Sequence, residues 1–546
     1  MTRTDRIRKD QILSRISTIL LFLAMLLLLL SRLKTIFNWF DEGFANLNGT
    51  SILRGEVPYK DFYLQYPPGQ PYAEAIIFKL FGVSLLPARL YDTMVFLAIA
   101  MGVYLIAKKV VPRWLATLAG LVTTVILVYW GLFGYPVLPA LACGIFSIYC
   151  TLEDADTGQR RWLFLAGTLI GIATIFRWDI GFYAGISVSV TVFLSHSVRV
   201  ARGGQFSTLA LLAAVNRVIL TWVPALVVIL STYGYAGYVG GWGDMWQQMV
   251  VYNVTSQNVF YSRSYPPLIF PVVPVKDIFF WANFDFSVWL EFYSPLFTYG
   301  LTFAYYVYAV LRKRLDWDLR HLGTIGVTIF GALLFLPALV SYDSAHGLAT
   351  WIIGFLVVVL LFWRIALSSR GPVKPILLAM LIGLTTLTVG FPIRAYWSNV
   401  TSFPLLGCYS QLERANCVAV FPPEEQAIEY VRAHTKEGES IFVGNQSQAG
   451  TNFNDIGFYF LSDRPSATRY YINLGGVTTT LPVQKTMAQE IESKNVNYIV
   501  LADFFSFPDP PGGGVHFLDD YIRSNYVTVA QFGNYVIWAK ARVDSH

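Results

Sequence analysis

The chain carries the run Leu20-Leu21-Phe22-Leu23-Ala24-Met25-Leu26-Leu27-Leu28-Leu29-Leu30 within an apolar window at 16–34, and the acidic pair Asp41-Glu42 follows a short distance on. An apolar window of about 20 residues covers the hydrocarbon core of a bilayer as one helix. Charged side chains are costly near a bilayer and are usually kept there for function. We therefore expect a membrane-spanning helix, and at the surface behind it a candidate acid/base site.

The composition indicates a polytopic membrane protein. Hydrophobic residues make up 55% of the 546 residues and charged residues only 14%, whereas an average soluble domain is roughly 25% charged. The mean hydropathy is +0.50. About eleven windows approach the length of a membrane span, at 16–34, 88–107, 114–132, 134–152, 162–177, 180–198, 208–232, 294–311, 322–340, 346–364 and 374–392. The fold class that follows is a polytopic α-helical membrane protein with about eleven transmembrane helices.

One apolar stretch, 162–198, is too long for a single span and is broken by Arg177, Trp178 and Asp179. Two short spans that meet at a charged outer turn fit this pattern better than one overlong helix.

Lysine and arginine residues in the short connections predict the orientation, because positive residues are held on the cytoplasmic side. They gather in alternate connections, as Lys108, Lys109 and Arg113; Arg160 and Arg161; Arg199 and Arg202; Arg312, Lys313, Arg314 and Arg320; and Arg364, Arg370 and Lys374. The N-terminal tail falls on the same side. We expect a cytoplasmic N-terminus in the plasma (inner) membrane, a retained first span without a cleavable signal, and outer segments at 35–87, 233–293 and 393–546.

The last segment differs in character from the rest. Residues 393–546 are more charged and turn-rich, and they alternate helix and strand patterns, with helices at 424–434 and 483–494, strands at 440–444 and 497–502, and a hairpin at 526–540. We predict a membrane domain at 1–392 and a soluble, extracytoplasmic α/β domain at 393–546.

The four cysteines form two pairs. Cys143 and Cys150 share one predicted helix and are expected to pack as small apolar residues. Cys408 and Cys417 lie in an outer loop, where oxidation is permitted, and predict a local disulfide. Neither spacing is that of a CxxC zinc site.

The first outer segment carries several short motifs. The acidic pair is followed by Leu53-Arg54-Gly55-Glu56-Val57-Pro58-Tyr59-Lys60-Asp61, then by Pro67-Pro68, Leu80-Phe81-Gly82 and Arg89. This series resembles the first outer loop of the C-type glycosyltransferases, the superfamily that includes protein O-mannosyltransferases and lipid A aminoarabinose transferases. The motif region covers about 50 residues, and the many-span plan with an outward C-terminal domain extends the resemblance loosely over the whole chain.

The resemblance implies an activity. A sugar would pass from a polyprenyl-phosphate carrier, on the extracytoplasmic face, to a hydroxyl of a glycan, glycolipid or protein, with inversion of the anomeric centre. The first carboxylate of the pair is the base in the resemblance, so Asp41 takes this role here. Glu42 would support it or bind acceptor, although the order of the two could be reversed. A carboxylate held by hydrogen bonds at the membrane surface suits proton removal. Nucleic acid is not an expected partner.

The departing lipid phosphate needs a cation or a metal ion to stabilise its charge. Candidates on or near the outer face are Arg89, Arg177, Lys60 and Arg263. Each could instead extend toward lipid headgroups. Arg89 and Arg177 are favoured because each is close in sequence to an aspartate at a span end, Asp92 and Asp179 respectively.

One departure from the resemblance concerns the residues before Pro67-Pro68. Relatives of the aminoarabinose-transferase type carry Glu-Lys there, whereas this chain has Gln65-Tyr66. A lysine contact to phosphate and a glutamate metal ligand are therefore in doubt at this place.

Further donor- and acceptor-binding candidates are Tyr59, Asp61, Tyr66, Asp92, Asp179, Asp343 and His346. Asp343 and His346 are spaced to share a helical face, which allows joint contact with a metal or with sugar hydroxyls. A helix N-cap with a hydrogen-bonded histidine is equally compatible. Some relatives show a similar Asp-x-x-His in this late outer loop. No cofactor is certain, and a divalent metal ion (Mg²⁺, Mn²⁺ or Ca²⁺) is left open, with Asp343 and His346 as its candidate ligands.

The aromatic segment 233–293 suits an interfacial belt and also a sugar- or lipid-binding groove.

Two other function classes fit parts of the pattern. A multi-span transporter is allowed by the number of spans, but the spans show few charges and no inverted repeat. A polysaccharide ligase or polymerase that uses lipid-pyrophosphate glycans would depend on arginine and histidine rather than on Asp41.

Overall fold

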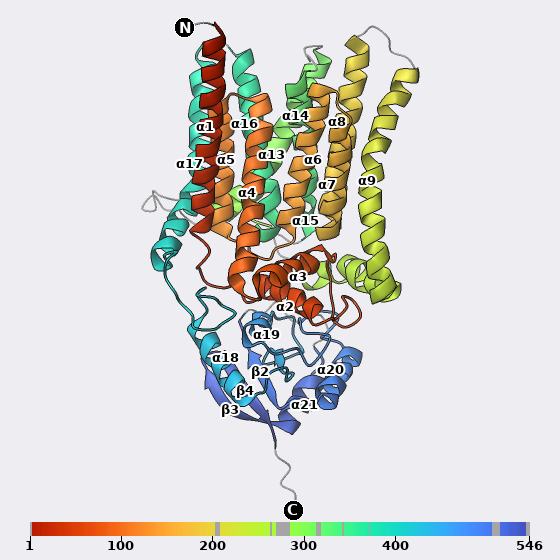
Figure 1. Ribbon diagram of the computed structural model, residues 1–546, viewed down its shortest axis with the longest axis vertical. Helices are drawn as coiled ribbons and strands as arrows, with labels where there is room; N and C mark the ends of the chain where they lie inside the picture. The colour runs from red at the N-terminus through yellow and green to blue at the C-terminus, as the bar shows by residue number, and fades with distance from the viewer. Residues whose placement is uncertain are drawn as a thin grey trace, which may run out of the picture.

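The computed structural model describes residues 3–202, 208–261, 265–268, 284–312, 318–340, 343–369, 371–504 and 514–541. Its long helices run side by side, with the N-terminus and the C-terminal sheet at opposite ends of the molecule (Figure 1). They are α1 (Arg3–Leu30), α4 (Leu85–Val110), α5 (Arg113–Trp130), α6 (Val137–Thr157), α7 (Arg161–Phe176), α8 (Trp178–Arg202), α9 (Thr208–Gly240), α13 (Phe284–Leu311), α14 (Leu319–Leu334), α16 (Ser344–Ser368) and α17 (Val373–Ser402).

These helices match the predicted spans one for one. Within the described ranges, nine helices are long and apolar enough to cross a membrane, and α7 is a shorter apolar helix. α13 lies among them (Figure 1). The chain is a multi-pass membrane protein, as the sequence predicts.

The expected break in the long apolar stretch is confirmed. α7 ends at Phe176, Arg177 has an extended backbone (φ −148°, ψ 106°), and α8 begins at Trp178. A single non-helical residue thus turns the chain back and leaves the Arg177 side chain at the end of two helices.

Several predicted span boundaries differ from the structure. α1 begins at Arg3 and α13 at Phe284, ahead of the expected starts at 16 and 294. α9 and α17 continue to Gly240 and Ser402, beyond the expected ends at 232 and 392, and each contains an internal proline. The expected span at 322–340 is divided into α14 and the short α15 (Leu336–Val340). Pro337 explains this division, because proline is tolerated in the first turn of a helix but not in its interior.

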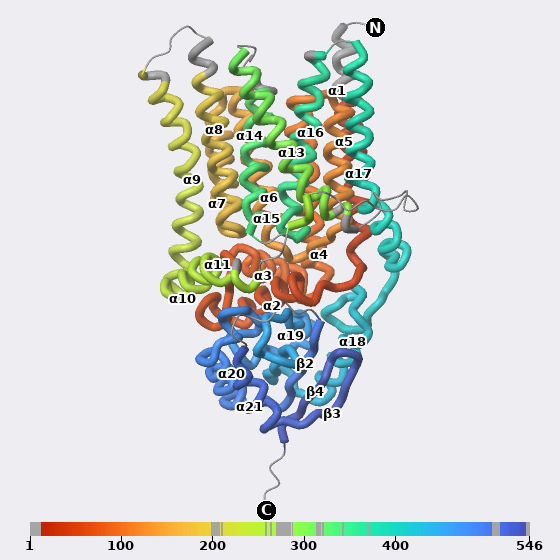
Figure 2. Tube along the Cα trace, turned by 180° about the vertical axis from the view of Figure 1, so that it is seen from behind, coloured from red at the N-terminus to blue at the C-terminus, as the bar shows by residue number. Residues whose placement is uncertain are grey.

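A layer of short helices lies between the long helices and the C-terminal sheet, as both views show (Figure 1, Figure 2). It contains α2 (Asp41–Leu53) and α3 (Gly69–Phe81), which the sequence pattern did not predict. It also contains α10 (Trp242–Trp246), a π-helical turn (Gln247–Val251), α11 (Tyr252–Thr255) and α12 (Gln257–Phe260). α2 and α3 approach closely at Gly49, where an added Cβ would lie 2.6 Å from the Cβ of Glu74. The acidic pair therefore opens a packed helix rather than an extended loop.

The C-terminal region is a four-stranded sheet with helices. Its elements are α18 (Pro422–His434), β1 (Phe442–Gly444), α19 (Gly457–Ser462), α20 (Leu481–Ser493), β2 (Tyr498–Ala502), α21 (Phe517–Asn525), β3 (Tyr526–Phe532) and β4 (Tyr535–Lys540). The strand order is β1-β2-β4-β3, with β1 and β2 parallel and the other pairs antiparallel. The two predicted helices, the two predicted strands and the closing hairpin are all present.

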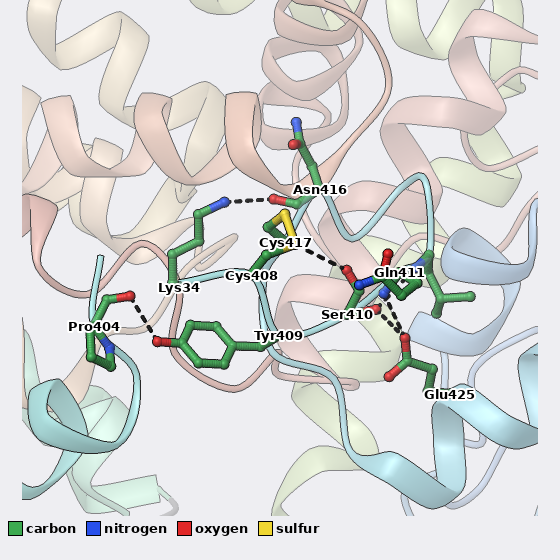
Figure 3. The surroundings of a disulfide bond; sticks show 10 residues. Lys34, Pro404, Cys408, Tyr409, Ser410, Gln411, Asn416, Cys417 and Glu425 are labelled. Carbon is green, nitrogen blue, oxygen red and sulfur yellow. Dashed lines mark hydrogen bonds between the residues drawn. A yellow bond between two sulfur atoms is a disulfide. The ribbon is translucent and has the colours of Figure 1, made fainter. Parts of the chain in front are cut away.

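The predicted disulfide joins Cys408 and Cys417, whose Cα atoms are 4.2 Å apart (Figure 3). The loop that it closes is bound to both ends of the first outer segment. The Lys34 Nζ donates to the carbonyl of Asn416 at 2.7 Å, and the amide of Leu85 donates to the carbonyl of Arg414 at 2.8 Å. Cys143 and Cys150 are free thiols within the helical bundle.

Candidate active site

Asp41 lies in the first turn of α2, and Asn38 fixes the start of this helix. The Asn38 Oδ1 accepts from the backbone amides of Phe40 (3.0 Å) and Asp41 (3.1 Å). The backbone amide of Asn38 in turn donates to Glu42 Oε2 at 3.2 Å. This reciprocal pattern satisfies backbone groups that a helix start leaves open, as a capping box does. The Asn38 side-chain amide also reaches Asp41 Oδ2 at 3.4 Å. The carboxylate of Asp41 is thus held in one orientation.

Glu42 is buried and forms an ion pair with the fully buried Arg89. Arg89 Nε donates to Glu42 Oε1 at 2.6 Å and Arg89 Nη2 to Glu42 Oε2 at 2.9 Å. The remaining guanidinium donors bind the carbonyls of Leu33, Thr35 and Ile36. Two parallel bonds between a guanidinium and a carboxylate are among the strongest polar contacts in proteins. Arg89 therefore joins the end of the first span to the start of α2.

A cavity of about 170 Å³ opens beside Asp41. We call it the sugar chamber, because the resemblance leads us to expect the donor sugar beside Asp41. Its lining residues come from widely separated parts of the chain and are Phe40, Asp41, Gln65, Tyr66, Tyr135, Tyr252, Asn253, Tyr261, Asp343, Ala345, His346, Phe453 and Leu474. Six of these side chains are aromatic. The chamber is thus a partly enclosed space that combines carboxylates with aromatic walls.

A second cavity, of about 220 Å³, adjoins the first. We call it the phosphate chamber, because it is lined by Arg177, which the resemblance leads us to expect at the lipid phosphate. The two cavities share Gln65, Tyr66, Asn253 and His346. The rest of the phosphate chamber is formed by Pro67, Arg177, Trp178, Asp179, Tyr183, Val254, Leu336, Pro337 and Val340. Two adjoining cavities therefore have Asp41 in the wall of one and Arg177 in the wall of the other.

Arg177 is held in place by Asp179 and Tyr66. Its Nε and Nη2 donate to the two carboxylate oxygens of Asp179 at 3.0 and 2.7 Å, and its guanidinium carbon lies 5.6 Å from the centre of the Tyr66 ring. A cation over an aromatic face is attracted by the ring. Tyr66, at the place where the resemblance has lysine, thus contacts the cation of the phosphate chamber.

Asp343 and His346 meet as the sequence predicts. Asp343 is the N-cap of α16, and its Oδ1 accepts from the backbone amide of His346 at 2.9 Å and lies 2.7 Å from His346 Nδ1. The capping alternative is therefore realised, and both side chains also line the sugar chamber.

Burial and the nearby charge of Asp343 raise the pKa of Asp41 to about 6, while the hydrogen bond from Asn38 and the proximity of His346 oppose this rise. An ordinary aspartate titrates near ~4. A carboxylate with a pKa of about 6 is a stronger base than usual and still ionised near neutral pH, which suits it to proton removal.

The other candidates lie away from both chambers. Lys60 is exposed, and Asp61 accepts from the amide of Val57 at 2.8 Å. Tyr59 is fully buried, with its hydroxyl donating to the carbonyl of Tyr66. Asp92 is buried and accepts from the amide of Gly134 at 2.7 Å. Arg263 lies outside the described residues.

Within the part of the chain that the structure describes, no three or more His, Cys, Asp and Glu side chains come together in a way that could hold a metal ion. Asp343 and His346 remain a pair, and their mutual hydrogen bond occupies Asp343 Oδ1 and His346 Nδ1.

Several lining residues were not identified from the sequence. Phe40, Tyr135, Phe453 and Leu474 line the sugar chamber, yet nothing in the local pattern around each of them distinguishes it from a core residue. Phe453 stacks parallel to Tyr261 at 6.2 Å and contacts Phe40 at 4.1 Å between ring centres. Tyr252, Asn253 and Tyr261, which also line this chamber, belong to the aromatic segment 233–293, for which the sequence favours an interfacial belt for most residues and allows a groove as the alternative.

Comparisons with known proteins agree with this architecture. Residues 65–226 match the family described as dolichyl-phosphate-mannose-protein mannosyltransferase. No curated protein sequence matches the chain.

The fold is similar to that of ArnT from Cupriavidus metallidurans. The structure of ArnT bound to undecaprenyl phosphate superposes with a TM-score of 0.54 at 13% identity, covering 96% of this chain and 98% of that chain. Its apo state gives 0.55 at 12% identity, covering 97% and 98%. At such low identity the likeness establishes the fold, and it extends over the whole chain, including the C-terminal region.

Proposed function

We propose that this chain, which has the fold of the C-type membrane glycosyltransferases, transfers a sugar from a polyprenyl-phosphate donor to a hydroxyl group of an acceptor. The match of residues 65–226 to a dolichyl-phosphate-mannose-dependent family and the undecaprenyl phosphate bound by the structural neighbour support a lipid-phosphate carrier. The acceptor is a glycan, a glycolipid or a protein.

One observation carries this proposal. Asp41 lines the sugar chamber, Arg177 lines the phosphate chamber, and the two chambers share four lining residues. Sugar transfer from a phosphate ester needs a base on the acceptor side of the anomeric carbon and a positive charge on the leaving-group side. The two adjoining chambers, one with a carboxylate and one with an arginine, support this assignment.

The reaction follows from this assignment. The acceptor hydroxyl oxygen attacks the anomeric carbon while Asp41 takes its proton, so a new carbon–oxygen bond forms on the side facing Asp41. The bond from the anomeric carbon to the phosphate oxygen breaks, and the electron pair leaves with the polyprenyl phosphate. Arg177 stabilises the charge that develops there. Attack from the side opposite to the leaving group inverts the anomeric centre.

The carrier lipid would reach the site through the apolar part of the phosphate chamber. Leu336, Pro337 and Val340 of α15 line this chamber together with Trp178 and Tyr183 of α8. An aromatic and aliphatic surface beside a fixed arginine suits a polyprenyl chain with its phosphate head.

Glu42 and Arg89 take positioning roles in this proposal. Arg89 lies in neither chamber, and its donors are engaged by Glu42 and by backbone carbonyls. We therefore assign the phosphate contact to Arg177, and to the Glu42–Arg89 pair the task of holding Asp41.

The proposed topology puts the chemistry outside the cytoplasm. The N-terminus lies in the cytoplasm, the membrane is the plasma (inner) membrane, and the domain at 393–546 is extracytoplasmic, with the membrane domain at 1–392. The positive connections of the sequence support this orientation. Phe453 and Leu474 of the C-terminal region complete the wall of the sugar chamber.

The test is a turnover assay on the full chain in nanodiscs, with a panel of polyprenyl-phosphate sugars and with EDTA as one condition. We expect sugar release or transfer that is lost in Asp41→Asn, because a neutral amide cannot take the proton. The exposed Asp520→Asn is the matched control and should retain wild-type activity. Arg177→Met should be impaired more strongly than Arg177→Lys, which keeps the charge.

Two results would contradict the proposal. No turnover of any donor by a folded protein would favour a transporter. Full activity in Asp41→Asn together with loss in His346→Ala, on lipid-pyrophosphate glycans, would favour a polysaccharide ligase or polymerase.

A further inference from the structure

The sugar chamber combines negative charge with aromatic walls in a way that restricts the donor. Asp41 and Asp343 both line it, and the charge of Asp343 acts on Asp41. We propose that the chamber accepts a sugar ring without a negative charge and excludes sugars that carry a carboxylate. This inference rests on the proposed function, because it concerns the sugar that the donor carries.

The first step concerns charge. Asp343 is paired with His346 at 2.7 Å, and Asp41 adds a second carboxylate to the same chamber. Among the described residues that line the sugar chamber, none is a lysine or an arginine. A uronic acid would bring a further carboxylate into this partly enclosed space, where like charges repel more strongly than in water.

The second step concerns the arginine of the adjoining chamber. Arg177 lines the phosphate chamber and makes two short hydrogen bonds to Asp179. Because Arg177 lies beside the apolar wall where the carrier lipid is proposed to bind, we assign it to the lipid phosphate. A carboxylate on the sugar would compete with the phosphate for this arginine rather than gain a partner of its own.

The third step concerns the walls. Phe40, Phe453 and Tyr261 form a run of ring contacts on one side of the chamber. Tyr66, Tyr135 and Tyr252 add further rings. The C–H faces of a neutral pyranose pack on aromatic rings, and the tyrosine hydroxyls suit sugar hydroxyl groups.

The size of the chamber limits the donor further. Ligand pockets usually begin near ~300 Å³, and this chamber measures about 170 Å³. It therefore suits a single sugar ring rather than an oligosaccharide.

The test uses donors that differ only at carbon 6 of the sugar. Full-length protein in nanodiscs is given equimolar mixtures of glucosyl and glucuronosyl, galactosyl and galacturonosyl, or mannosyl and mannuronosyl polyprenyl phosphates. The ratio of kcat/KM within each pair is measured from donor consumption. We expect the uncharged member to be favoured at least tenfold in every pair that turns over.

A variant tests the electrostatic cause. Asp343→Asn removes one charge and keeps a residue that caps helices well, so the ratio should fall severalfold toward one. Asp520→Asn should leave it unchanged.

The possible failures are distinguishable. Equal use of both members, or preference for the uronosyl donor, would overturn the inference and leave the proposed function intact. A high ratio that Asp343→Asn does not lower would overturn the assignment of discrimination to this carboxylate. Turnover of no donor in any pair would overturn the proposed function and the inference together.

Discussion

Arg89 and Glu42 form a buried, two-bond ion pair directly beside Asp41. The Nε–Oε1 and Nη2–Oε2 distances are 2.6 and 2.9 Å, and the side chains are 0% and 2% exposed. The same guanidinium binds three carbonyls at the end of the first span. The position of Asp41 relative to the bundle therefore depends on a contact between two elements that are distant in sequence.

The first prediction concerns this pair. Glu42→Gln leaves the Arg89 charge buried without a counter-charge, and breaking a buried pair from one side typically costs about 3–5 kcal/mol. We expect a lower unfolding temperature in detergent and a strong loss of activity. Arg89→Lys should be impaired as well, because a lysine cannot form the two parallel bonds. The matched control is Glu56→Gln, which breaks the exposed pair with Arg54 and should change stability by about 0–1 kcal/mol. Wild-type stability in Glu42→Gln would contradict this account.

The second prediction is a pH profile. Burial first and the charge of Asp343 second raise the pKa of Asp41 to about 6. Since the base must be ionised to act, kcat/KM should be on its plateau above pH 7 and fall about tenfold for each pH unit below the pKa. Removing the Asp343 charge with Asp343→Asn should move the midpoint to lower pH. A profile that stays flat from pH 7 to pH 5 would exclude Asp41 as the titrating base.

The third prediction tests a close approach between α2 and α19. An added Cβ at Gly43 would lie 2.5 Å from the amide nitrogen of Gly457 and 2.6 Å from its Cα. These are backbone atoms that cannot move aside cheaply, so Gly43→Ala should displace the first turn of α2 and lower kcat. Gly300→Ala is the matched control, because nothing lies within 4 Å of the added Cβ there. Equal activity of the two variants in the turnover assay would show that this contact does not set the site.

The fourth prediction concerns the Cys408–Cys417 loop. Its hydrogen bonds to Lys34 and Leu85 fix both ends of the segment that contains α2 and α3. Replacing both cysteines by serine frees this loop, and the loss of a native disulfide typically removes roughly 2–4 kcal/mol. We expect a lower unfolding temperature and reduced turnover, measured under identical conditions without reductant. Cys143→Ala, which removes a thiol from the bundle, should leave both nearly unchanged. An unchanged Cys408→Ser/Cys417→Ser variant would argue against a clamping role.

The fifth prediction concerns two buried carboxyl groups of the C-terminal region. Burial is the main cause that raises the pKa of Asp455 to about 7 and the pKa of Glu424 well above its ordinary value. Tyr535 donates to Asp455 at 2.6 Å, whereas the Glu424 Oε1 finds no partner among the described residues.

The direction of the pH effect follows from these raised pKa values. The folded state holds the protons more tightly than the unfolded state, so stability is highest below the unfolded pKa near ~4 and declines as pH rises through about 7. Scanning calorimetry from pH 5 to pH 8 should show a falling unfolding temperature. Glu424→Gln should flatten this fall, and an equally steep fall in the variant would contradict the assignment.

The membrane helices could be predicted from sequence because long apolar windows have few alternatives in a bilayer. The strands and helices of the C-terminal region could be predicted as well, since their apolar residues alternate or recur with helical period. α2 and α3 were not predicted, because short helices that lie along a surface layer have no span-length window. Their polar and apolar residues are arranged by contacts with α19 and α4 that no local pattern reveals.

The candidate site could be predicted only in part, because several of its contacts join residues that are far apart in the sequence. Asp41, Tyr66, Arg177, Asp343 and His346 were candidates from their motifs, and the structure gathers them around two adjoining chambers. Their catalytic roles remain predictions. Arg89 was a candidate phosphate ligand, and its pairing with Glu42 depends on a contact across 47 positions of sequence. Phe453 and Leu474 lie far along the chain from Asp41, so only the folded arrangement reveals them.

The wall of the sugar chamber joins Phe40 and Asp41, near the first span, to Phe453 and Leu474, near the end of the chain. A polypeptide still emerging from the ribosome contains Asp41 but lacks both the far wall and α19, against which the first turn of α2 packs. Under the proposed function, a nascent or truncated copy would therefore be inactive until the final segment has been synthesised and has folded against α2.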